Sequence, residues 1–178
     1  MRSETNLLLF RAQQEIIRGD TAAAREMAGR ALELHPGLGD TGLVLGAAAE
    51  ADGESETAAE YYRKAAGKEP FNPNPELRLS LLHLEKGETH RAEEAARRAL
   101  DKDPLAWRAH SLLADVSRDR DDEEGAYRHL VRAVELNPNS ARDHQNLGLY
   151  YGEKGDRVLA GYHRQRAGKL MEAGGVKD

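Results

Sequence analysis

The chain has 178 residues, with 26 basic and 31 acidic side chains and a formal net charge of −5. The absence of cysteine excludes disulfide scaffolds, zinc–cysteine sites and thiol nucleophiles, and the negative charge argues against a general binder of nucleic acids or anionic membranes. No apolar run approaches the roughly 18 residues of a membrane-spanning helix, so we expect no membrane insertion.

An internal repeat organises nearly the whole chain. Four of the six prolines follow one another at intervals of 34 residues: Pro36, Pro70, Pro104 and Pro138. Counting back from them gives five units, which cover residues 5–38, 39–72, 73–106, 107–140 and 141–174. The twentieth and twenty-seventh positions are alanine in every unit, which chance does not explain.

Within each unit, the residues predict a helix, a tight turn and a second helix. The first helix has leucine at the seventh position in four units and a small residue at the eighth in all five. The fifteenth position is glycine except for Asp121, and an acidic residue follows it in every unit. Glycine there ends a helix in the left-handed conformation, and the acid favours the start of the next helix. The proline near the end of the unit stops the second helix.

These positions recur in the register of the tetratricopeptide repeat (TPR) family, which the chain resembles from Thr5 to about Gly174. The resemblance implies an all-α fold, a right-handed superhelical solenoid of antiparallel helix pairs, with residues 1–178 as a single domain. The small residues allow the helices to pack closely. The chain departs from the family at the fourth position, where a bulky residue is usual and where it has Leu8, Gly42, Glu76, His110 and His144.

In TPR proteins the first helices line a concave groove that holds a segment of another protein. The groove residues that the resemblance implies are Leu9, Gln13, Leu43, Ala47, Leu77, Arg78, Leu81, Arg108, Ser111, Asp115, Arg118, Arg142, Gln145, Asn146 and Leu149. This set is largely apolar in the first three units, where Phe10, Val44 and Leu84 join it, and largely polar in the last two. The alternative is that some of these leucines pack in the core. The charged clamp by which co-chaperones hold chaperone tails is absent, since Leu9 and Gln13 occupy its first lysine and asparagine positions.

Other patterns suggest chemistry, but each has a simpler interpretation. Residues 37–42 match the glycine pattern of dinucleotide-binding loops, yet a helical segment precedes them where that fold needs a strand, which favours a turn. Equivalent histidines of successive repeats, such as His110 and His144, are expected about a helix spacing apart, too far to share a metal ion. The acidic run 119–124 lacks the glycine and glutamate of a calcium loop and indicates a helix end and a helix start.

The last helix is basic, with Arg164, Arg166 and Lys169, which indicates a solvated capping face. The alternative is a contact with a phosphate or a partner. We expect no cofactor, no metal ion and no catalytic residue in this chain.

The sequence leads to three hypotheses of function, none of them enzymatic for this chain alone. The first is a scaffold or adaptor that binds a protein or peptide segment in the groove. The second is a homo-oligomer formed through the first helix, where no earlier helix covers Leu7, Leu8 and Phe10. The third is the TPR portion or regulatory subunit of a larger enzyme or assembly. The absence of an export signal predicts a cytoplasmic location, and the alternative is a trimmed domain of an exported protein.

Overall fold

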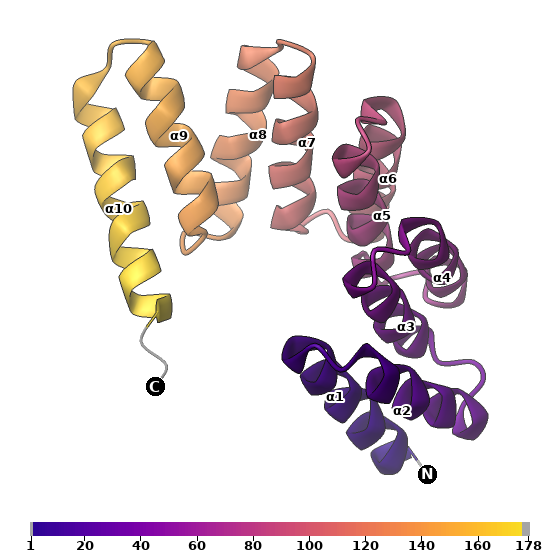
Figure 1. The fold of residues 1–178 in the computed structure, drawn as a ribbon. Helices are drawn as coiled ribbons and strands as arrows, with labels where there is room; N and C mark the ends of the chain where they lie inside the picture. Colours follow the sequence, from indigo (N-terminus) through magenta and orange to yellow (C-terminus); the bar gives the residue numbers. More distant parts are fainter. Residues whose placement is uncertain (1, 176–178) are drawn as a thin grey trace. The chain divides into compact units, whose positions relative to one another are not determined.

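The computed structural model of the chain describes residues 2–175, and within this range it contains ten α-helices and no strand (Figure 1). The helices are α1 (Arg2–Arg18), α2 (Thr21–Leu34), α3 (Gly39–Ala51), α4 (Ser55–Lys68), α5 (Asn74–Glu85), α6 (Thr89–Lys102), α7 (Trp107–Asp119), α8 (Glu123–Leu136), α9 (Ala141–Glu153) and α10 (Arg157–Gly175). They form consecutive antiparallel pairs, one pair for each predicted repeat. The prediction of an all-α fold built from helix pairs is confirmed.

The helices belong to two compact units, one that ends at Asp103 and one that begins at Pro104. The first unit holds α1 to α6, and the second holds α7 to α10. Within each unit, a helix packs against its partner in the repeat, and the second helix of a repeat also packs against the first helix of the following repeat. Each unit therefore has a core of its own.

The turns inside the repeats have the backbone conformation that the glycine pattern predicts. Gly19, Gly53, Gly87 and Gly155 have φ angles between 70° and 86°. Asp121, the residue at this position in the fourth repeat, has a φ of 58° and is the non-glycine residue with positive φ in the described part of the chain. The turn geometry is therefore kept where the glycine is lost.

We expect the Asp121→Gly variant to be more stable than the parent chain by about 0.5–1 kcal/mol. A side chain in the left-handed region carries a steric penalty of roughly 1–2 kcal/mol, and part of its relief is offset by the greater freedom of glycine in the unfolded state. Urea denaturation compares the two chains, with Asp119→Gly in the last turn of α7 as a destabilising control. A variant less stable than the parent would contradict the prediction.

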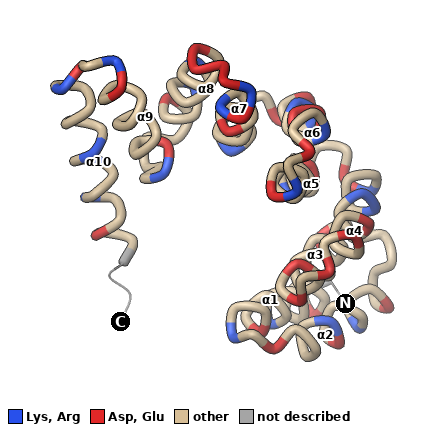
Figure 2. The backbone as a smooth tube through the Cα atoms, turned by 45° about the horizontal axis from the view of Figure 1, so that its top comes forward, with Lys and Arg blue, Asp and Glu red and all other residues tan. Residues whose placement is uncertain are grey.

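The acidic residues after these turns act in two ways. Asp20, Asp122 and Asp156 each accept a hydrogen bond from the backbone N–H three residues later, at 2.8–3.0 Å. Glu54 and Glu88, whose side chains are one carbon longer, make no such bond to the helix that follows them. The three aspartates are helix caps, whereas the glutamates act through their charge. Figure 2 shows acidic residues gathered where α8 begins, which confirms the predicted helix start in the run 119–124.

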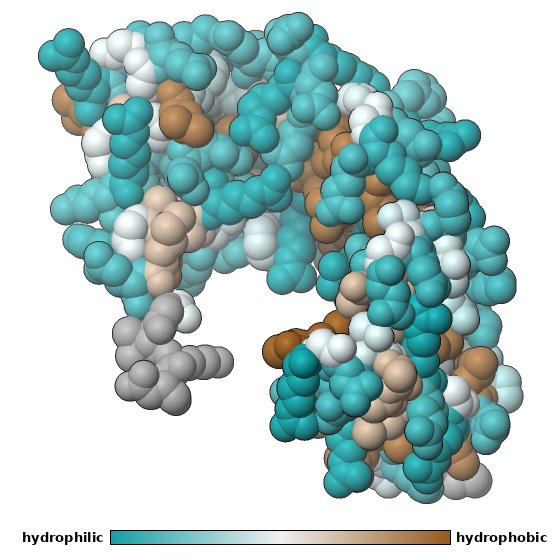
Figure 3. Space-filling model, viewed as in Figure 1, coloured by the Kyte–Doolittle hydropathy of each residue, from teal (hydrophilic) through white to brown (hydrophobic). Residues whose placement is uncertain are grey.

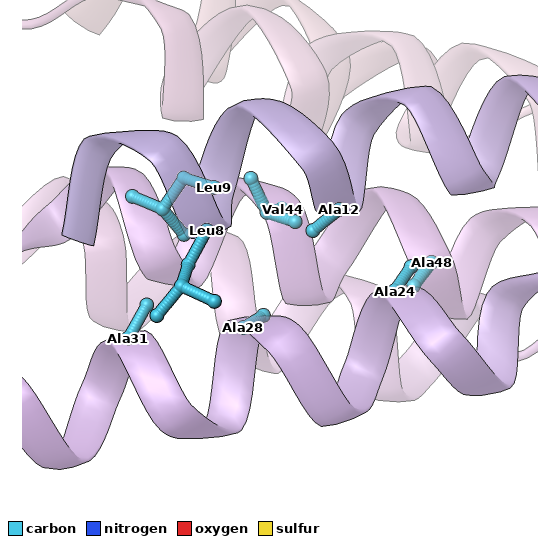
Figure 4. Packing of buried hydrophobic residues seen from close by; sticks show 8 residues of the cluster. All are labelled: Leu8, Leu9, Ala12, Ala24, Ala28, Ala31, Val44 and Ala48. Atoms are coloured by element: carbon cyan, nitrogen blue, oxygen red, sulfur yellow. The ribbon is translucent and has the colours of Figure 1, made fainter. Parts of the chain in front are cut away.

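The core is built mainly from alanine. All ten alanines of the twentieth and twenty-seventh positions are at most 3% exposed. Figure 4 shows this packing in the first repeat, where Leu8 of α1 lies over Ala28 and Ala31 of α2. Tyr62, in α4, is the largest fully buried side chain. Helices that meet through alanine approach closely, so the chain needs few large apolar residues.

Candidate functional site

The predicted groove residues of the first unit are partly core and partly surface. Leu9 and Leu77 are 6% and 9% exposed, so they contribute mainly to packing. Leu43, Ala47 and Leu81 are half-buried, and the polar Gln13 and Arg78 are exposed. Phe10 is 59% exposed on α1. The surface of this unit that a ligand can reach is therefore largely apolar, with the polar side chains of Gln13 and Arg78 beside it.

A buried tyrosine forms a hydrogen bond with a glutamate near this surface. The hydroxyl group of Tyr62 donates a hydrogen bond to Oε2 of Glu50, and burial raises the pKa of this phenol, so it stays protonated. The same carboxylate oxygen lies 3.9 Å from Nη1 of Arg78. Arg78 is therefore an exposed cation within ion-pair distance of a carboxylate that a core residue binds.

In the second unit, two of the predicted groove arginines already have a partner inside the protein. Asp115 is 7% exposed, and Nη2 of Arg118 lies 2.5 Å from its Oδ1. Arg142 donates to the other oxygen, Oδ2, of the same carboxylate. Burial raises the pKa of Asp115, and the two guanidinium groups oppose this rise. Asp115 therefore holds both arginines in place.

Ser111, another predicted groove residue, is buried, and its hydroxyl donates to Oδ2 of Asp143 at 2.8 Å. The accessible surface of the second unit comes from other predicted residues. Gln145 is exposed, Asn146 is half-buried and Leu149 is 49% exposed. The guanidinium of Arg108 stacks on the Trp107 ring, with a carbon-to-centroid distance of 5.0 Å.

The two units thus offer different surfaces on their first helices. The surface is largely apolar in the first unit and largely polar in the second. Sequence reasoning missed the Asp115–Arg142 bond and the buried position of Ser111. Asp115 and Arg142 are 27 residues apart, so they do not occupy equivalent positions of the 34-residue repeat, and the repeat pattern gives no reason to pair them.

In each of the last two repeats, the histidine at the fourth position lies close to a second histidine of the same repeat. His110 Nδ1 lies 3.1 Å from His129 Nδ1, and His144 Nδ1 lies 2.9 Å from His163 Nδ1. Each pair joins the two helices of one repeat. In both repeats the paired histidines occupy the fourth and twenty-third positions. The sequence shows this recurrence, but a comparison of equivalent histidines in successive repeats does not reveal that the two positions within one repeat lie close together.

The surroundings of the second pair determine which of its ring nitrogens carry a proton. His144 Nε2 lies 3.1 Å from the carbonyl oxygen of Pro138, so this nitrogen carries a proton and donates it. In the neutral pair, His144 Nδ1 then accepts the Nδ1–H of His163. Burial lowers the pKa of His163, and the neighbouring His144 lowers it further, so this ring is uncharged at neutral pH.

In the third repeat, the residue at the fourth position is a glutamate that forms ion pairs with the second helix. Glu76 is 6% exposed, and its carboxylate lies 3.1 Å from Nε of Arg98 and 3.9 Å from Nζ of Lys102 on α6. The polar departures from the bulky residue of the family are therefore matched by polar partners on the second helix of the same repeat.

The other patterns have structural roles. Residues 37–42 follow α2 and continue into α3, with no strand before them, so the turn interpretation is confirmed. Among residues 2–175, no three histidine, aspartate or glutamate side chains are arranged to hold a metal ion. None of the described helices combines the length and apolar character needed to cross a membrane.

Comparisons with known proteins agree with this architecture. The sequence matches the tetratricopeptide repeat family model over residues 12–73 and 77–141. No curated protein matches it at a significant level.

Three solved structures illustrate the likeness of fold. PilF of Pseudomonas aeruginosa is 20% identical, with a TM-score of 0.83 over 99% of this chain and 79% of that one. A thermophilic TPR protein of Thermus thermophilus is 18% identical, with a TM-score of 0.76 over 93% of this chain and 91% of that one. Residues 41 to the end of MamA from Desulfovibrio magneticus RS-1 are 19% identical, with a TM-score of 0.70 over 96% of both chains.

Proposed function

Because the chain belongs to the tetratricopeptide repeat family, we propose that it is a non-enzymatic adaptor that binds a segment of another protein on its first helices. The observation that carries the proposal is the accessible surface of these helices. In the first unit Phe10, Leu43 and Leu81 expose apolar atoms at groove positions, and in the second unit Arg108 and Gln145 expose polar ones. The surface of the first unit suits apolar side chains of a bound segment, and the surface of the second unit suits acidic ones.

Arg108 is the cation that would meet an acidic group of the partner. Arg118 and Arg142 are both bound to Asp115, so each guanidinium already has a carboxylate partner within the protein. No carboxylate pairs with Arg108 in the described part of the chain, and stacking on Trp107 orients its guanidinium. The planar fork of arginine can bind a carboxylate through two parallel hydrogen bonds.

We expect the Arg108→Glu variant to bind the partner segment at least about tenfold more weakly, since a charge-assisted hydrogen bond is lost and a repulsion replaces it. Crosslinking of the pulled-down complex would first identify the segment and map its contacts to the first helices. The dissociation constant would then be measured by calorimetry. Arg128→Glu, on α8, is the matched control because Arg128 is not a groove residue. Equal affinity for the Arg108→Glu variant and the parent chain would refute this placement of the site.

Self-association is the second candidate, and an exposed stripe on α1 favours it. Leu7, Phe10 and Ile17 are 49%, 59% and 78% exposed, and their spacing places them on one side of the helix. Figure 3 shows apolar side chains at the surface near the end of α1. Leu8, in contrast, is 8% exposed and packs against α2, so it is part of the core. A second copy of the chain could cover the stripe with its own α1.

If the stripe mediates association, the double variant Phe10→Gln/Ile17→Gln is expected to raise the dissociation constant of the oligomer more than tenfold. The reason is that each large apolar side chain contributes on the order of 1 kcal/mol or more when it leaves water. Light scattering over a range of micromolar concentrations measures the effect. Val158→Gln, a change at an 81% exposed valine on α10, serves as the control. A parent chain that stays monomeric throughout this range would exclude the second candidate.

A further inference from the structure

The second unit contains a pocket of about 610 Å³ that lies apart from the proposed groove. The residues that line it belong to α8, α9 and α10 and to the turn between α8 and α9. On α9, the pocket is lined by Leu147 and Tyr151, whereas the groove positions are Gln145 and Leu149. Residues two apart on a helix point about 200° away from each other. The pocket and the groove surface therefore lie on opposite sides of α9.

Aromatic rings are concentrated in this pocket. The chain has only six tyrosines, two phenylalanines and one tryptophan, yet Tyr127, Tyr151 and Tyr162 all line it, together with His144 and His163. Tyr127 and Tyr151 are half-buried against the core cluster of Ala114, Leu130 and Leu147, and both also line the pocket. Tyr162 is in fact 58% exposed, so it contributes mostly to the surface of the pocket.

The rings show both faces and edges. Tyr151 and His163 are stacked, with centroids 5.5 Å apart and planes inclined by 14°. Tyr162 meets the same histidine edge-on, at 5.0 Å and 81°. A planar aromatic group can add to such an arrangement by stacking or by an edge-to-face contact, whereas an aliphatic group gains only from burial. Val131 and Val134 of α8 supply the apolar remainder of the wall.

The charge of the pocket is positive, although the protein as a whole is negative. Arg166 and Lys169 of α10 line it, one helical turn apart. The acidic residue of the lining is Glu135, and its carboxylate already accepts a hydrogen bond from Arg132 at 3.0 Å. Arg166 donates from Nη2 to Asn139 Oδ1 at 3.0 Å, which leaves further N–H groups of its guanidinium for an anion.

From these observations we propose that the pocket binds an aromatic group that carries a carboxylate, with the ring among the tyrosines and the carboxylate at Arg166 and Lys169. Both a small aromatic acid and the C-terminal aromatic residue of a peptide have this chemistry. The site is independent of the proposed groove, so either can fail without the other.

The test uses the full chain with methyl-labelled valine and leucine, observed by NMR. The first ligand pair is 3-phenylpropanoate and its uncharged amide, and the second is a short peptide that ends in phenylalanine, with a free or an amidated C-terminus. We expect the free acids to shift the methyl signals of Val131, Val134 and Leu147, with a dissociation constant of about 1 mM or below. The signals of Val116, in the core of α7, should not move. The tighter of the two acids identifies the source of the ligand.

The charge requirement is tested with the double variant Arg166→Gln/Lys169→Gln, which is expected to bind the acids at least about tenfold more weakly. Arg128→Gln, which removes a cation of α8 outside the pocket, should bind as the parent chain does. Tyr162→Ala removes an exposed ring and should also weaken binding, with the fold intact. The proposal is overturned if the acids cause no shift at the pocket, if the amides bind as well as the acids, or if the double variant binds like the parent chain.

Discussion

The Tyr62→Ala variant is expected to lose about 3–5 kcal/mol of unfolding free energy, the largest effect of any single substitution proposed for this chain. The side chain is 0% exposed and belongs to the core cluster that joins α3, α4 and α5. Its ring lies directly against the backbone of α3, since a methyl group added at Gly46 would lie 2.3 Å from Tyr62 Cε1. Four residues of this cluster are alanines, whose short side chains cannot fill the space that the ring would leave: Ala49, Ala58, Ala59 and Ala95.

Two further variants separate the ring from its hydroxyl group. Tyr62→Phe keeps the ring but removes the hydrogen bond to Glu50, and we expect it to lose about 1–3 kcal/mol. Tyr61→Ala changes the neighbouring tyrosine, which is half-buried, and should lose distinctly less than Tyr62→Ala. Urea denaturation followed by circular dichroism gives all three values. If Tyr62→Ala lost no more than Tyr61→Ala, the core would not depend on this ring.

The same residue also links stability to the proposed groove. Tyr62 holds Glu50, and Glu50 lies 3.9 Å from Arg78 on the surface of the first unit. Tyr62→Phe is therefore expected to loosen Arg78 with the core still filled. A segment that contacts Arg78 would then bind more weakly to a chain that is folded, which separates this effect from a general loss of structure.

The sequence predicted the helices well because their ends depend on local chemistry. A glycine with positive φ, an acid after it and a proline after the second helix act within a few residues of where they stand. The buried alanines were predictable for a related reason, since a position that is small in every repeat must face another helix. Asp121 shows the limit of this local view, because the tertiary structure keeps the left-handed turn there without glycine.

The candidate site was less predictable, because its polar groups are arranged by contacts between helices. Arg142 was expected to face a partner, but it binds Asp115 of the preceding repeat. Leu9 was expected in the groove, but it is 6% exposed in the core of the first repeat. In both instances a neighbouring side chain or helix, which the position in the repeat does not specify, determines where the side chain lies. The position in the repeat therefore predicts the helix to which a residue belongs more reliably than it predicts the contacts of its side chain.

The small residues that define the repeat make a sharp prediction about packing, and Ala92 in α6 is its best test. The residue is 0% exposed, and its carbonyl oxygen accepts a hydrogen bond from the Ser80 hydroxyl of α5 at 2.9 Å. The two helices therefore lie close together at this point, with no space for a larger side chain. Leucine at position 92 must force them apart or adopt a strained rotamer, and either outcome loses about 1–3 kcal/mol.

Glu94→Leu provides the control for Ala92→Leu, since Glu94 is exposed on the same helix and leucine and glutamate have similar helix propensities. We expect this control to change the unfolding free energy by no more than about 0.5 kcal/mol. Urea denaturation of the two variants then isolates the steric effect from any effect of leucine on α6 itself. Equal stability of both variants would mean that the helices of the third repeat can separate without penalty. In that event the small size of alanine at position 92 would not be required for the stability of the third repeat.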